Sequence, residues 1–350
     1  MHLPSVKNLK VAGKRVLLRT NYDVPLSLTG WVVDETRIHE SLPTIGYLLS
    51  QKAKIIIISH LGSPGGKVVL NLSLKPAVDV LSELVLDVTG KIKIPLIDKM
   101  GLKERFAKKI VVLENLRFDA REEANDKNFA KKLASLADFY VNDAFACSHR
   151  RHASIVGIPK FLPAAFGFDF LEEVKVLTKL RGKPQKPVVL LLGGVKEDKI
   201  EYAKKLIDWA DWILVGGKLV EHDGIPALLN HHKIVGSLIK NGQDITMKTA
   251  EEFAKIMAKA KTIVWSGPMG NFYDSNYEQG TKKIAEAVVK SGAFSVAGGG
   301  DTEAAITKFG LNKKIDFISS GGGAMLAFLA EGTLPGIRAI ANDKYQINNL

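Results

Sequence analysis

Short hydrophobic runs of strand length recur along the chain and alternate with segments whose hydrophobic residues repeat at helical spacing. The expected strands are RVLLR (15–19), KIIIIS (54–59), IVVLE (110–114), FYVND (139–143), VVLLLGG (188–194), WILVGG (212–217), TIVWSG (262–267), FSVAGGG (294–300) and DFISSGGG (316–323). Periodic helical segments such as 126–137 and 276–291 separate them. Runs that are hydrophobic on both faces and alternate with helices are typical of parallel sheets covered on both sides.

The alternation breaks at residues 170–187, where a charged helical segment runs into a turn rich in Gly, Pro and Lys. Such a segment is typical of a connection between two domains. The sequence therefore predicts an α/β protein with two doubly wound, Rossmann-like parallel-sheet domains joined by a hinge helix. The predicted boundaries are 1–169 for the first domain, 170–187 for the interdomain helix and hinge, and 188–335 for the second domain.

Composition narrows the class of protein. With 350 residues, 46% hydrophobic and 25% charged, the chain has the size and composition of a globular protein with more than one core. Its longest hydrophobic runs are too short to span a bilayer, and its N-terminus lacks a hydrophobic secretory segment. The single cysteine, Cys147, excludes an internal disulfide. We expect a cytoplasmic protein with no membrane partner.

The formal net charge of +12 favours anionic partners. Nucleic acid and phosphorylated metabolites are both candidates. No basic stretch is interleaved with aromatic residues, as a base-stacking surface requires, so nucleic acid is the less favoured partner.

Cations and hydrogen-bonding side chains follow the predicted strands of the first half. They are Arg19, Asn21, Asp23, Arg37, Ser59, His60, Arg117, His149, Arg150 and His152. A single arginine is more often a surface residue, but arginines at successive strand ends predict a pocket for a small polyanion, because ligands of open α/β sheets bind there. A zinc site at Cys147, His149 and His152 is disfavoured because no fourth ligand is near in sequence.

Glycines and lysines follow the predicted strands of the second half. Lys196 and Lys199 come directly after one strand, and GGGDT (298–302) and GGG (321–323) follow two others. Neither a Walker A motif nor a G-x-G-x-x-G fingerprint is present. One glycine turn alone is a tight connection, and Asp301 alone is a helix N-cap. Several such turns on one sheet instead predict a site for nucleotide phosphates, with Asp301 and Thr302 placed to meet a metal or the helix amides.

These segments, in this order, resemble the phosphoglycerate kinase family. The resemblance rests on DETRIHESLPTI, SHLG-P, LENLRF, LADFYVNDAF, HRRHAS, GIPKFLPAAFGF, KTIVWSGPMG, GGGDTEAAITKFGL and SSGGGAMLAFLAEGTLPGI, and it covers most of the chain. It implies reversible Mg²⁺-dependent phosphoryl transfer between 1,3-bisphosphoglycerate and ADP, giving 3-phosphoglycerate and ATP. It further implies a monomer that closes about a hinge near 163–187 and whose tail, 336–350, returns to the first domain.

The resemblance also assigns roles to residues. The implied catalytic residues are Arg37, Lys196, Gly300 and Gly323. The implied substrate-binding residues are Asn21, Asp23, Arg37, His60, Arg117 and Arg150. The implied nucleotide-binding residues are Lys196, Lys199, Gly217, Gly267, Pro268, Gly298, Gly299, Gly300, Asp301 and Thr302, and Asp301 is the implied Mg²⁺ ligand.

The chain departs from the family pattern at several of these positions. The family's R-V-D-F-N-V-P reads RTNYDVP, so Asn21 and Asp23 have exchanged places, and Ser63 replaces an arginine on the substrate side. On the nucleotide side GGVKEDK is one residue short, and Lys218, Ser266 and Tyr273 replace family residues. Two further functions follow: a kinase of this fold with another substrate or nucleotide, and a catalytically silent anion-binding paralogue.

Overall fold

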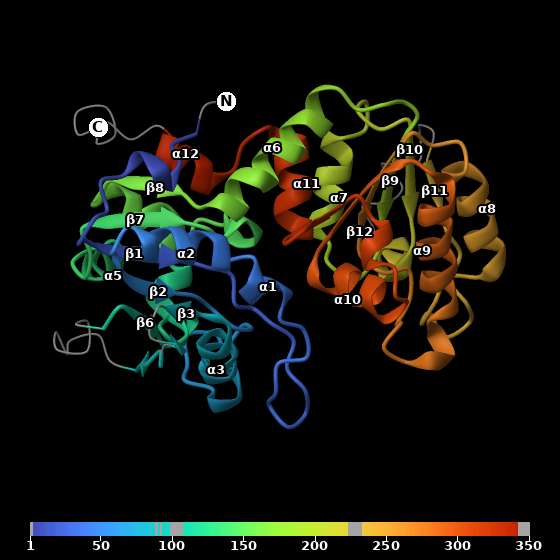
Figure 1. The fold of residues 1–350 in the computed structure, drawn as a ribbon. Coiled ribbons are helices and arrows are strands. Elements are labelled where there is room, and N and C mark those ends of the chain that lie inside the picture. The colour runs from blue at the N-terminus through green and yellow to red at the C-terminus, as the bar shows by residue number, and fades with distance from the viewer. Residues whose placement is uncertain (1–2, 88–89, 92, 99–107, 223–232, 342–350) are drawn as a thin grey trace. The chain divides into compact units, whose positions relative to one another are not determined.

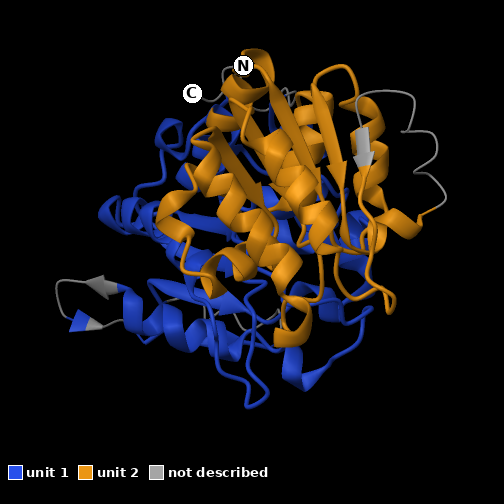
Figure 2. Ribbon diagram, turned by 90° about the vertical axis from the view of Figure 1, so that its right-hand side faces the viewer, with its two compact units in different colours: residues 1–175, 334–350 blue, residues 176–333 orange. Residues whose placement is uncertain are grey.

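The structure is a computed structural model that describes residues 3–87, 90–91, 93–98, 108–222 and 233–341. The chain divides into two compact units: residues 1–175 with 334–350, and residues 176–333 (Figure 2). Each unit is built on its own parallel sheet, which confirms the predicted α/β class with two parallel-sheet domains.

The first unit contains a six-stranded parallel sheet in the order β5-β6-β2-β1-β7-β8 (Figure 1). Its strands are β1 (Arg15–Arg19), β2 (Lys54–Ile58), β5 (Leu96–Ile97), β6 (Ile110–Leu113), β7 (Phe139–Asn142) and β8 (Ala164–Phe166), and β3 (Leu86–Asp87) pairs separately with β4 (Gly90–Lys91). All four isoleucines of β2 are buried. A central parallel strand is covered on both faces, so its sequence is hydrophobic at consecutive positions.

The first unit carries α1 (Thr36–His39), α2 (Leu42–Ser50), α3 (Lys75–Leu84), α4 (Ala120–Glu123), α5 (Lys127–Ala134) and α12 (Pro335–Ala341). Helix α5 illustrates how the sequence sets its bounds. The side chain of Asp126 accepts from the backbone N of Phe129 at 2.7 Å and caps the helix start. Phe129, Ala130 and Leu133 then form the buried face. Helix α6 (Phe168–Gly182) runs across the boundary between the two units.

The second unit contains a parallel sheet in the order β11-β10-β9-β12-β13-β14. Its strands are β9 (Val188–Leu192), β10 (Trp212–Val215), β11 (Lys233–Val235), β12 (Thr262–Ser266), β13 (Phe294–Gly298) and β14 (Phe317–Ser319). Its other helices are α7 (Asp198–Lys205), α8 (Met247–Met257), α9 (Gln279–Ser291), α10 (Gly300–Lys308) and α11 (Gly322–Glu331). The central strands β9 and β12 are buried along their whole length.

The predicted returning tail, 336–350, is described only in part, because residues 342–350 lie outside the described residues. Helix α12, which precedes them, packs on the first unit. The backbone N of Gly336 donates to the carbonyl of Ser148 at 3.0 Å.

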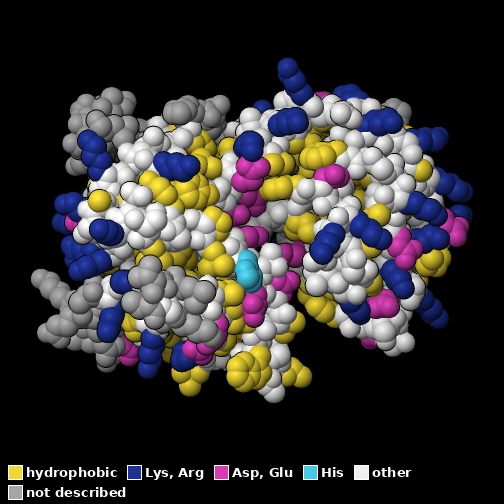
Figure 3. Space-filling view, viewed as in Figure 1, with side chains coloured by type: hydrophobic (Ala, Val, Ile, Leu, Met, Phe, Trp, Pro, Cys, Tyr) yellow, Lys and Arg dark blue, Asp and Glu magenta, His cyan; other side chains and the backbone are white. Residues whose placement is uncertain are grey.

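No single helix among the described residues is long and apolar enough to cross a membrane. Helices α11 and α12 together reach the required length and composition, but they are bent by 64° relative to each other. In the face drawn in Figure 3, the described Lys and Arg side chains are separate groups among acidic and uncharged ones, not a continuous basic stripe.

Candidate active site

The order of strands in each sheet indicates where a ligand would bind. In the first unit the chain leads from β1 out to β2 and returns to β7 on the other side of β1. In the second unit it leads from β9 to β10 and β11 and returns to β12 on the other side of β9. Ligands of open α/β sheets bind beyond the strand ends at this reversal. The residues that follow β1 and those that follow β9 and β12 are therefore the candidates.

Beyond β1, Asp23 joins two of the predicted substrate-binding residues. A guanidinium nitrogen of Arg37 donates to the backbone carbonyl of Asp23, and Nη1 lies 3.8 Å from its Oδ2. Nε2 of His60 lies 3.9 Å from the same oxygen. The backbone N of Gly62 donates to Asp23 Oδ1 at 2.8 Å. We call this group, together with three further residues that adjoin it, the basic rim: Arg19, Asn21, Asp23, Arg37, His60 and Arg117.

Arg19 is the fully buried member of the basic rim, and a network of hydrogen bonds holds its side chain. Its Nε donates to Ser154 Oγ at 3.0 Å, and its Nη2 lies 3.2 Å from Nδ1 of His60. The hydroxyl and the backbone N of Ser154 both donate to the buried carboxylate of Glu122. Burial raises the pKa of Glu122, and the charge of Arg19 opposes that rise. Arg19 therefore fixes the imidazole of His60 through its Nδ1 atom.

The two buried histidines near these arginines are neutral at pH 7. Burial lowers the pKa of His60 well below its usual value, and the positive charges of Arg19, Arg117 and Arg37 lower it further. Burial and the charges of Arg117 and Arg19 lower the pKa of His152 to about 3. Uncharged imidazoles hydrogen-bond without adding to the repulsion among the guanidinium groups, which an anion would relieve.

Two buried polar atoms here have no partner among the described residues: Asn21 Nδ2 and His152 Nδ1. Arg117 Nε accompanies them without a hydrogen bond, but it lies 3.4 Å from the carboxylate of Glu123. Arg117 is otherwise tied in, because its Nη1 donates to the carbonyl of Gly62 at 2.8 Å. Buried polar atoms are nearly always paired, since an unpaired one costs about 1–3 kcal/mol. Unpaired atoms next to cations are what a site for a polar anion requires.

Arg150 lies near the basic rim without joining its network. Its side chain is exposed, and its Nε donates to Nε2 of His149 at 3.4 Å. Its positive charge lowers the pKa of Arg117 and of His152. The predicted zinc alternative has no support here: no cluster of three metal-ligating side chains occurs in the described part of the chain, and Cys147 Sγ donates to the carbonyl of Ala144.

In the second unit the turns after β9, β10 and β12 meet through their backbones. Gly194 N donates to the carbonyl of Pro268 at 2.7 Å. Gly267 has φ +100°, and a Cβ there would lie 2.1 Å from the carbonyl oxygen of Gly193. A Cβ on Gly217, whose φ is +61°, would lie 2.7 Å from Gly194 N. Only glycine fits these positions. We call these turns and the two triple-glycine turns the glycine rim: 193–194, 216–217, 267–268, 298–300 and 321–323.

The two predicted lysines have different environments. Lys199 is buried, and its Nζ donates to the carbonyls of Gly193 at 2.8 Å and Ser266 at 3.1 Å. Burial, with the nearby charge of Lys196, lowers its pKa to about 8. Lys199 thus ties the ends of β9 and β12 together. Lys196 is exposed in the turn that follows β9, where its charge is available to a ligand.

The two triple-glycine turns bring two helix starts together. Helix α10 begins at Gly300 and α11 at Gly322, and neither has a side-chain cap. A Cβ on Gly322 would lie 2.6 Å from the carbonyl oxygen of Gly298, so the turns touch. Uncapped first-turn amides and the helix dipole favour a bound anion. Gly300 and Gly323 both lie in these first turns.

Asp301 and Thr302 serve different purposes at the start of α10. The N-cap position belongs to Gly299, so the interpretation of Asp301 as a simple N-cap is wrong. Asp301 is exposed, and its Oδ1 accepts from the Tyr273 hydroxyl at 3.2 Å. The buried hydroxyl of Thr302 accepts from Gly267 N at 2.7 Å and donates to the carbonyl of Gly298 at 3.0 Å. Thr302 therefore joins two glycine turns.

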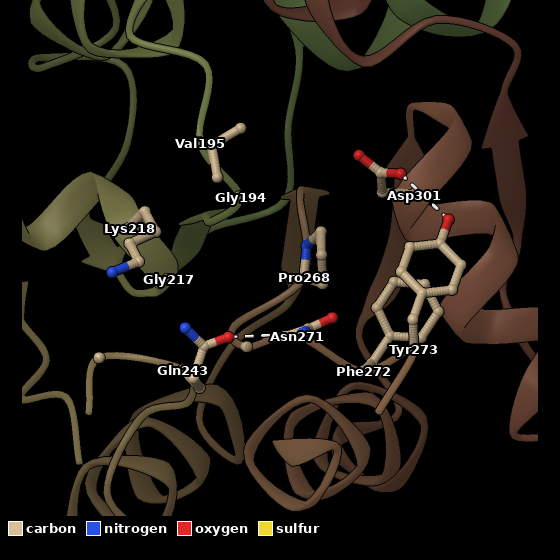
Figure 4. Close-up of a pocket in the computed structure, with 12 residues that line it drawn as sticks. Gly194, Val195, Gly217, Lys218, Gln243, Pro268, Asn271, Phe272, Tyr273 and Asp301 are labelled. Carbon is tan, nitrogen blue, oxygen red and sulfur yellow. Dashed lines mark hydrogen bonds between the residues drawn. The ribbon is translucent and has the colours of Figure 1, made fainter. Parts of the chain in front are cut away.

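The glycine rim borders a pocket of about 280 Å³ within the second unit (Figure 4). Its lining residues are Gly194, Val195, Gly217, Lys218, Gly242, Gln243, Pro268, Gly270, Asn271, Phe272, Tyr273 and Asp301. Lys218 and Gln243 supply polar groups on one side, and Asp301 and Tyr273 on another. Asp301 is the one acid among the lining residues.

The donor set at this pocket fits Mg²⁺ held mainly by a nucleotide. Mg²⁺ in nucleotide sites is bound through one or two carboxylates and the substrate phosphates, not by a cage of protein ligands. Asp301 supplies one exposed carboxylate beside two uncapped helix starts. A site built only from protein ligands is not found among the described residues, where no cluster of three acidic or metal-binding side chains exists.

Two parts of the site lack a sequence signal. Ser154 and Glu122 hold Arg19, yet Glu122 stands in an exposed-looking run, AREE, and only the packing of α4 reveals its burial. Gln243 and Asn271 face the pocket from loops joined by a hydrogen bond from Asn271 N to the carbonyl of Gln243. These contacts link residues far apart in the sequence, which a single chain cannot reveal.

Comparison with known proteins identifies the family. The family model described as phosphoglycerate kinase matches residues 6–222 and 229–332. A curated phosphoglycerate kinase of Thermosipho africanus is 39% identical over 400 residues, covering 97% of this chain and 98% of that protein. One from Finegoldia magna is 38% identical over 393 residues, covering 97% and 99%. Both alignments are longer than this chain of 350 residues, so these relatives have segments that it lacks.

Solved structures agree. The phosphoglycerate kinase of Pyrococcus horikoshii has a TM-score of 0.82 and 29% identity, with 97% of this chain and 98% of that chain covered. That of Coxiella burnetii has a TM-score of 0.75 and 31% identity, with 97% and 99% covered. The predicted resemblance and the prediction of a phosphotransferase are confirmed. The chain belongs to the phosphoglycerate kinase family.

Proposed function

We propose that the chain catalyses the reversible, Mg²⁺-dependent transfer of a phosphoryl group between 1,3-bisphosphoglycerate and ADP, giving 3-phosphoglycerate and ATP, the reaction of glycolysis and gluconeogenesis. The observation that carries the proposal is the basic rim. Three guanidinium groups and the unpaired amide nitrogen of Asn21 gather there around the neutral imidazole of His60, with the neutral His152 close to Arg117 and Arg19. A small molecule with a phosphate and a carboxylate matches this surface, because guanidinium groups bind both anions in bidentate fashion.

In the proposed site Arg37, Asn21, His60, Arg117 and Arg150 bind the phosphoglycerate. Arg37 has its guanidinium beside Asp23 and a side chain that is 13% exposed. It is the cation we assign to the transferring phosphoryl group. Asp23 Oδ2 lies 3.8 Å from Arg37 Nη1 and 3.9 Å from His60 Nε2 and positions both, so the exchange of Asn21 and Asp23 relative to the family pattern is compatible with binding.

The proposed chemistry needs no general base. In the direction that forms 1,3-bisphosphoglycerate, the attacking group is a carboxylate, which is ionised at pH 7 because such groups titrate near 4. A carboxylate oxygen forms the new bond to the γ-phosphorus of ATP. The bond from that phosphorus to the β,γ-bridging oxygen breaks, and this oxygen leaves as part of ADP. Alignment and neutralisation of charge then supply the catalysis. The two histidines agree with this, because their lowered pKa makes them weak proton acceptors at pH 7.

The nucleotide phosphates bind at the glycine rim in this proposal. The first-turn amides of α10 and α11, including those at Gly300 and Gly323, and the exposed ammonium of Lys196 neutralise the phosphate oxygens. Asp301 would hold Mg²⁺, which neutralises phosphate charge and orients the transferring group when bound. Lys199 shapes the site indirectly by fixing the ends of β9 and β12.

We further propose a cytoplasmic monomer whose partners are the small-molecule substrates alone. The single cysteine fits a reducing compartment. Light scattering during gel filtration tests the oligomeric state.

A kinase of the same fold with another nucleotide is the second candidate. Lys218 lines the pocket, and its ammonium lies 3.4 Å from Glu221. A cation on the pocket wall would favour nucleotides whose base presents oxygen acceptors. Replacing ATP by GTP in the assay below separates the two candidates.

The decisive experiment is a coupled assay with Mg-ATP and 3-phosphoglycerate, on the wild-type protein, Arg37→Ala and Arg15→Ala. Arg15 is the matched control, because it lies at the end of β1 away from the basic rim and, among the described residues, its side chain pairs only with Asp138, at 3.8 Å. We expect turnover by the wild type and the control, and a loss of at least about a thousandfold in Arg37→Ala. Equal turnover by all three, or none by the wild type, would contradict the proposal.

A further inference from the structure

Tyr273 and Asp301 come from different elements and meet at the pocket. Tyr273 lies in the segment after β12, and Asp301 lies in the first turn of α10. The tyrosine hydroxyl donates to Asp301 Oδ1 at 3.2 Å (Figure 4). A phenol keeps its proton at neutral pH, so the Tyr273 hydroxyl is the donor and the carboxylate is the acceptor.

The phenol ring is held so that its hydroxyl stays in reach. The rings of Tyr273 and Phe272 lie 4.2 Å apart between centroids, and Phe272 is buried. The carbonyl of Phe272 accepts from Lys308 Nζ at 2.7 Å, and Lys308 also pairs with Glu278 at 2.6 Å. Lys308 is the last residue of α10. The segment is therefore tied to α10 at both ends of the helix, by Lys308 at its end and by Asp301 at its start.

The bond to Tyr273 leaves half of the Asp301 carboxylate available. Figure 4 shows the second carboxylate oxygen directed away from Tyr273. Mg²⁺ requires a near-ideal octahedral arrangement of ligands, so the orientation of a lone carboxylate has a large effect on its binding. Hydrogen bonds to a metal-binding carboxylate set that orientation, and their loss typically costs 10–100-fold in metal affinity.

We propose that Tyr273 is a positioning residue: its hydroxyl orients the Asp301 carboxylate so that the free oxygen receives the metal of a metal–nucleotide complex. This inference rests on the proposed function, since it concerns the same nucleotide site. It gives Tyr273, a departure from the family pattern, a role in the metal dependence of nucleotide binding that is separate from contact with the nucleotide itself.

Calorimetric titration of the full chain with ADP, with and without Mg²⁺, tests the proposal. Tyr273→Phe removes the hydroxyl and keeps the ring. We expect it to bind Mg-ADP about tenfold more weakly than wild type and to bind metal-free ADP equally well. Tyr277→Phe is the control, because Tyr277 lies in the same segment but outside the pocket lining, and its binding should match wild type. In an Asp301→Ala background, Tyr273→Phe should have no further effect, since the two residues act as a pair.

Other results would overturn the proposal. An equal loss with and without Mg²⁺ would mean that the hydroxyl contacts the nucleotide. Unchanged or tighter binding of Mg-ADP by Tyr273→Phe would mean that the bond is idle or competes with the metal. If the wild type itself bound ADP no more tightly with Mg²⁺ than without it, the proposed Mg²⁺-dependent function and this inference would both fail. If the wild type binds ADP more tightly with Mg²⁺ but Tyr273→Phe does not show the expected loss, only the role of Tyr273 is overturned and the proposed function stands.

Discussion

The two rims are both suited to anions, but they are built from opposite materials. The basic rim is built from long charged and polar side chains, and its fully buried member, Arg19, is held by Ser154, which donates to Glu122. The glycine rim has few side chains and offers backbone amides at two uncapped helix starts. The first depends on buried electrostatics, and the second depends on close backbone approach. Substitutions should therefore damage the two rims for different reasons.

The largest expected effect on stability is that of Arg19→Met. It removes the nearby positive charge of Arg19 from the buried Glu122 and the hydrogen bond from Arg19 to Ser154 that links the two residues, and loss of one partner from a buried charged network costs about 3–5 kcal/mol. Arg15→Met, at the exposed end of the same strand, should cost less than about 1 kcal/mol. Urea unfolding of both variants measures the difference.

A second substitution separates charge from packing. In Arg19→Met/Glu122→Gln both charges of the Arg19–Ser154–Glu122 network are gone, and we expect part of the lost free energy of unfolding to return. If Arg19→Met costs no more than Arg15→Met, the buried network does not support the basic rim.

Gly267→Ala probes the other rim by sterics alone. The residue has φ +100°, and its Cβ would lie 2.1 Å from the Gly193 carbonyl oxygen and 2.4 Å from Lys199 Nζ. We expect a loss of at least about 3 kcal/mol in the free energy of unfolding, with loss of Mg-ADP binding. Gly292→Ala is the control, because it has φ +65° and open space around its Cβ, and it should cost about 1–2 kcal/mol. Similar costs for the two variants would contradict the close approach.

Much of the fold could be predicted from the sequence because buried parallel strands are hydrophobic at every position. All nine expected strands are present. The missed strands β5, β8 and β11 lie at sheet edges, and the missed strands β3 and β4 form a separate two-stranded sheet. Each of the five has two or three residues, too few for a pattern to emerge.

The place of a residue in the fold was predictable where it follows a strand directly, as with His60 and the triple glycines. Arg37 lies instead in α1, and its approach to Asp23 needed the structure. The role of a residue was not predictable where its side chain is buried against the backbone of neighbouring turns. Lys199 follows a strand like Lys196, but it is buried against two backbone carbonyls. The hydroxyl of Thr302 likewise bonds to Gly267 and Gly298. Sequence order gives a residue's place on the rim, whereas only packing gives the direction of its side chain.

Two buried residues next to the rims, His152 and Lys199, should lower the stability of the fold in different ranges of pH. His152 has a pKa of about 3 in the fold, below the usual 6.5. Between these values the unfolded chain binds a proton that the fold does not, so falling pH costs about 1.4 kcal/mol per unit. Lys199 has a pKa of about 8 instead of 10.5. For Lys199 the free energy of unfolding also falls by about 1.4 kcal/mol per unit as the pH falls, but between pH 10.5 and pH 8.

Urea unfolding from pH 4 to pH 10 measures both contributions as differences from wild type. His152→Gln should flatten the pH dependence on the acid side, below about pH 6.5, and leave the alkaline side unchanged. Lys199→Met should flatten it between pH 8 and 10 only. A variant that shifts stability equally at every pH would show that the residue's titration is not linked to folding.

The smallest expected effect concerns the buried hydroxyl of Ser266, which has no hydrogen-bond partner among the described residues. A Cβ on Gly322 would lie 2.8 Å from it, which places the hydroxyl beside the start of α11. Ser266→Ala removes an unpaired polar group, so the free energy of unfolding should stay equal or rise by less than about 1 kcal/mol. Ser319→Ala, at the end of β14, should instead lower it by about 1 kcal/mol, because Ser319 Oγ accepts from Gly321 N.

Ser266→Ala should weaken ligand binding even though it does not weaken the fold. If its hydroxyl is unpaired because it serves a bound phosphate, Ser266→Ala should bind Mg-ADP about fivefold more weakly while being no less stable. A gain in stability together with a loss in affinity is what a site built for a ligand predicts, since the free protein bears the cost of the unpaired group. Unchanged affinity would make Ser266 a packing residue, and the glycine rim would then recognise phosphate through its backbone alone.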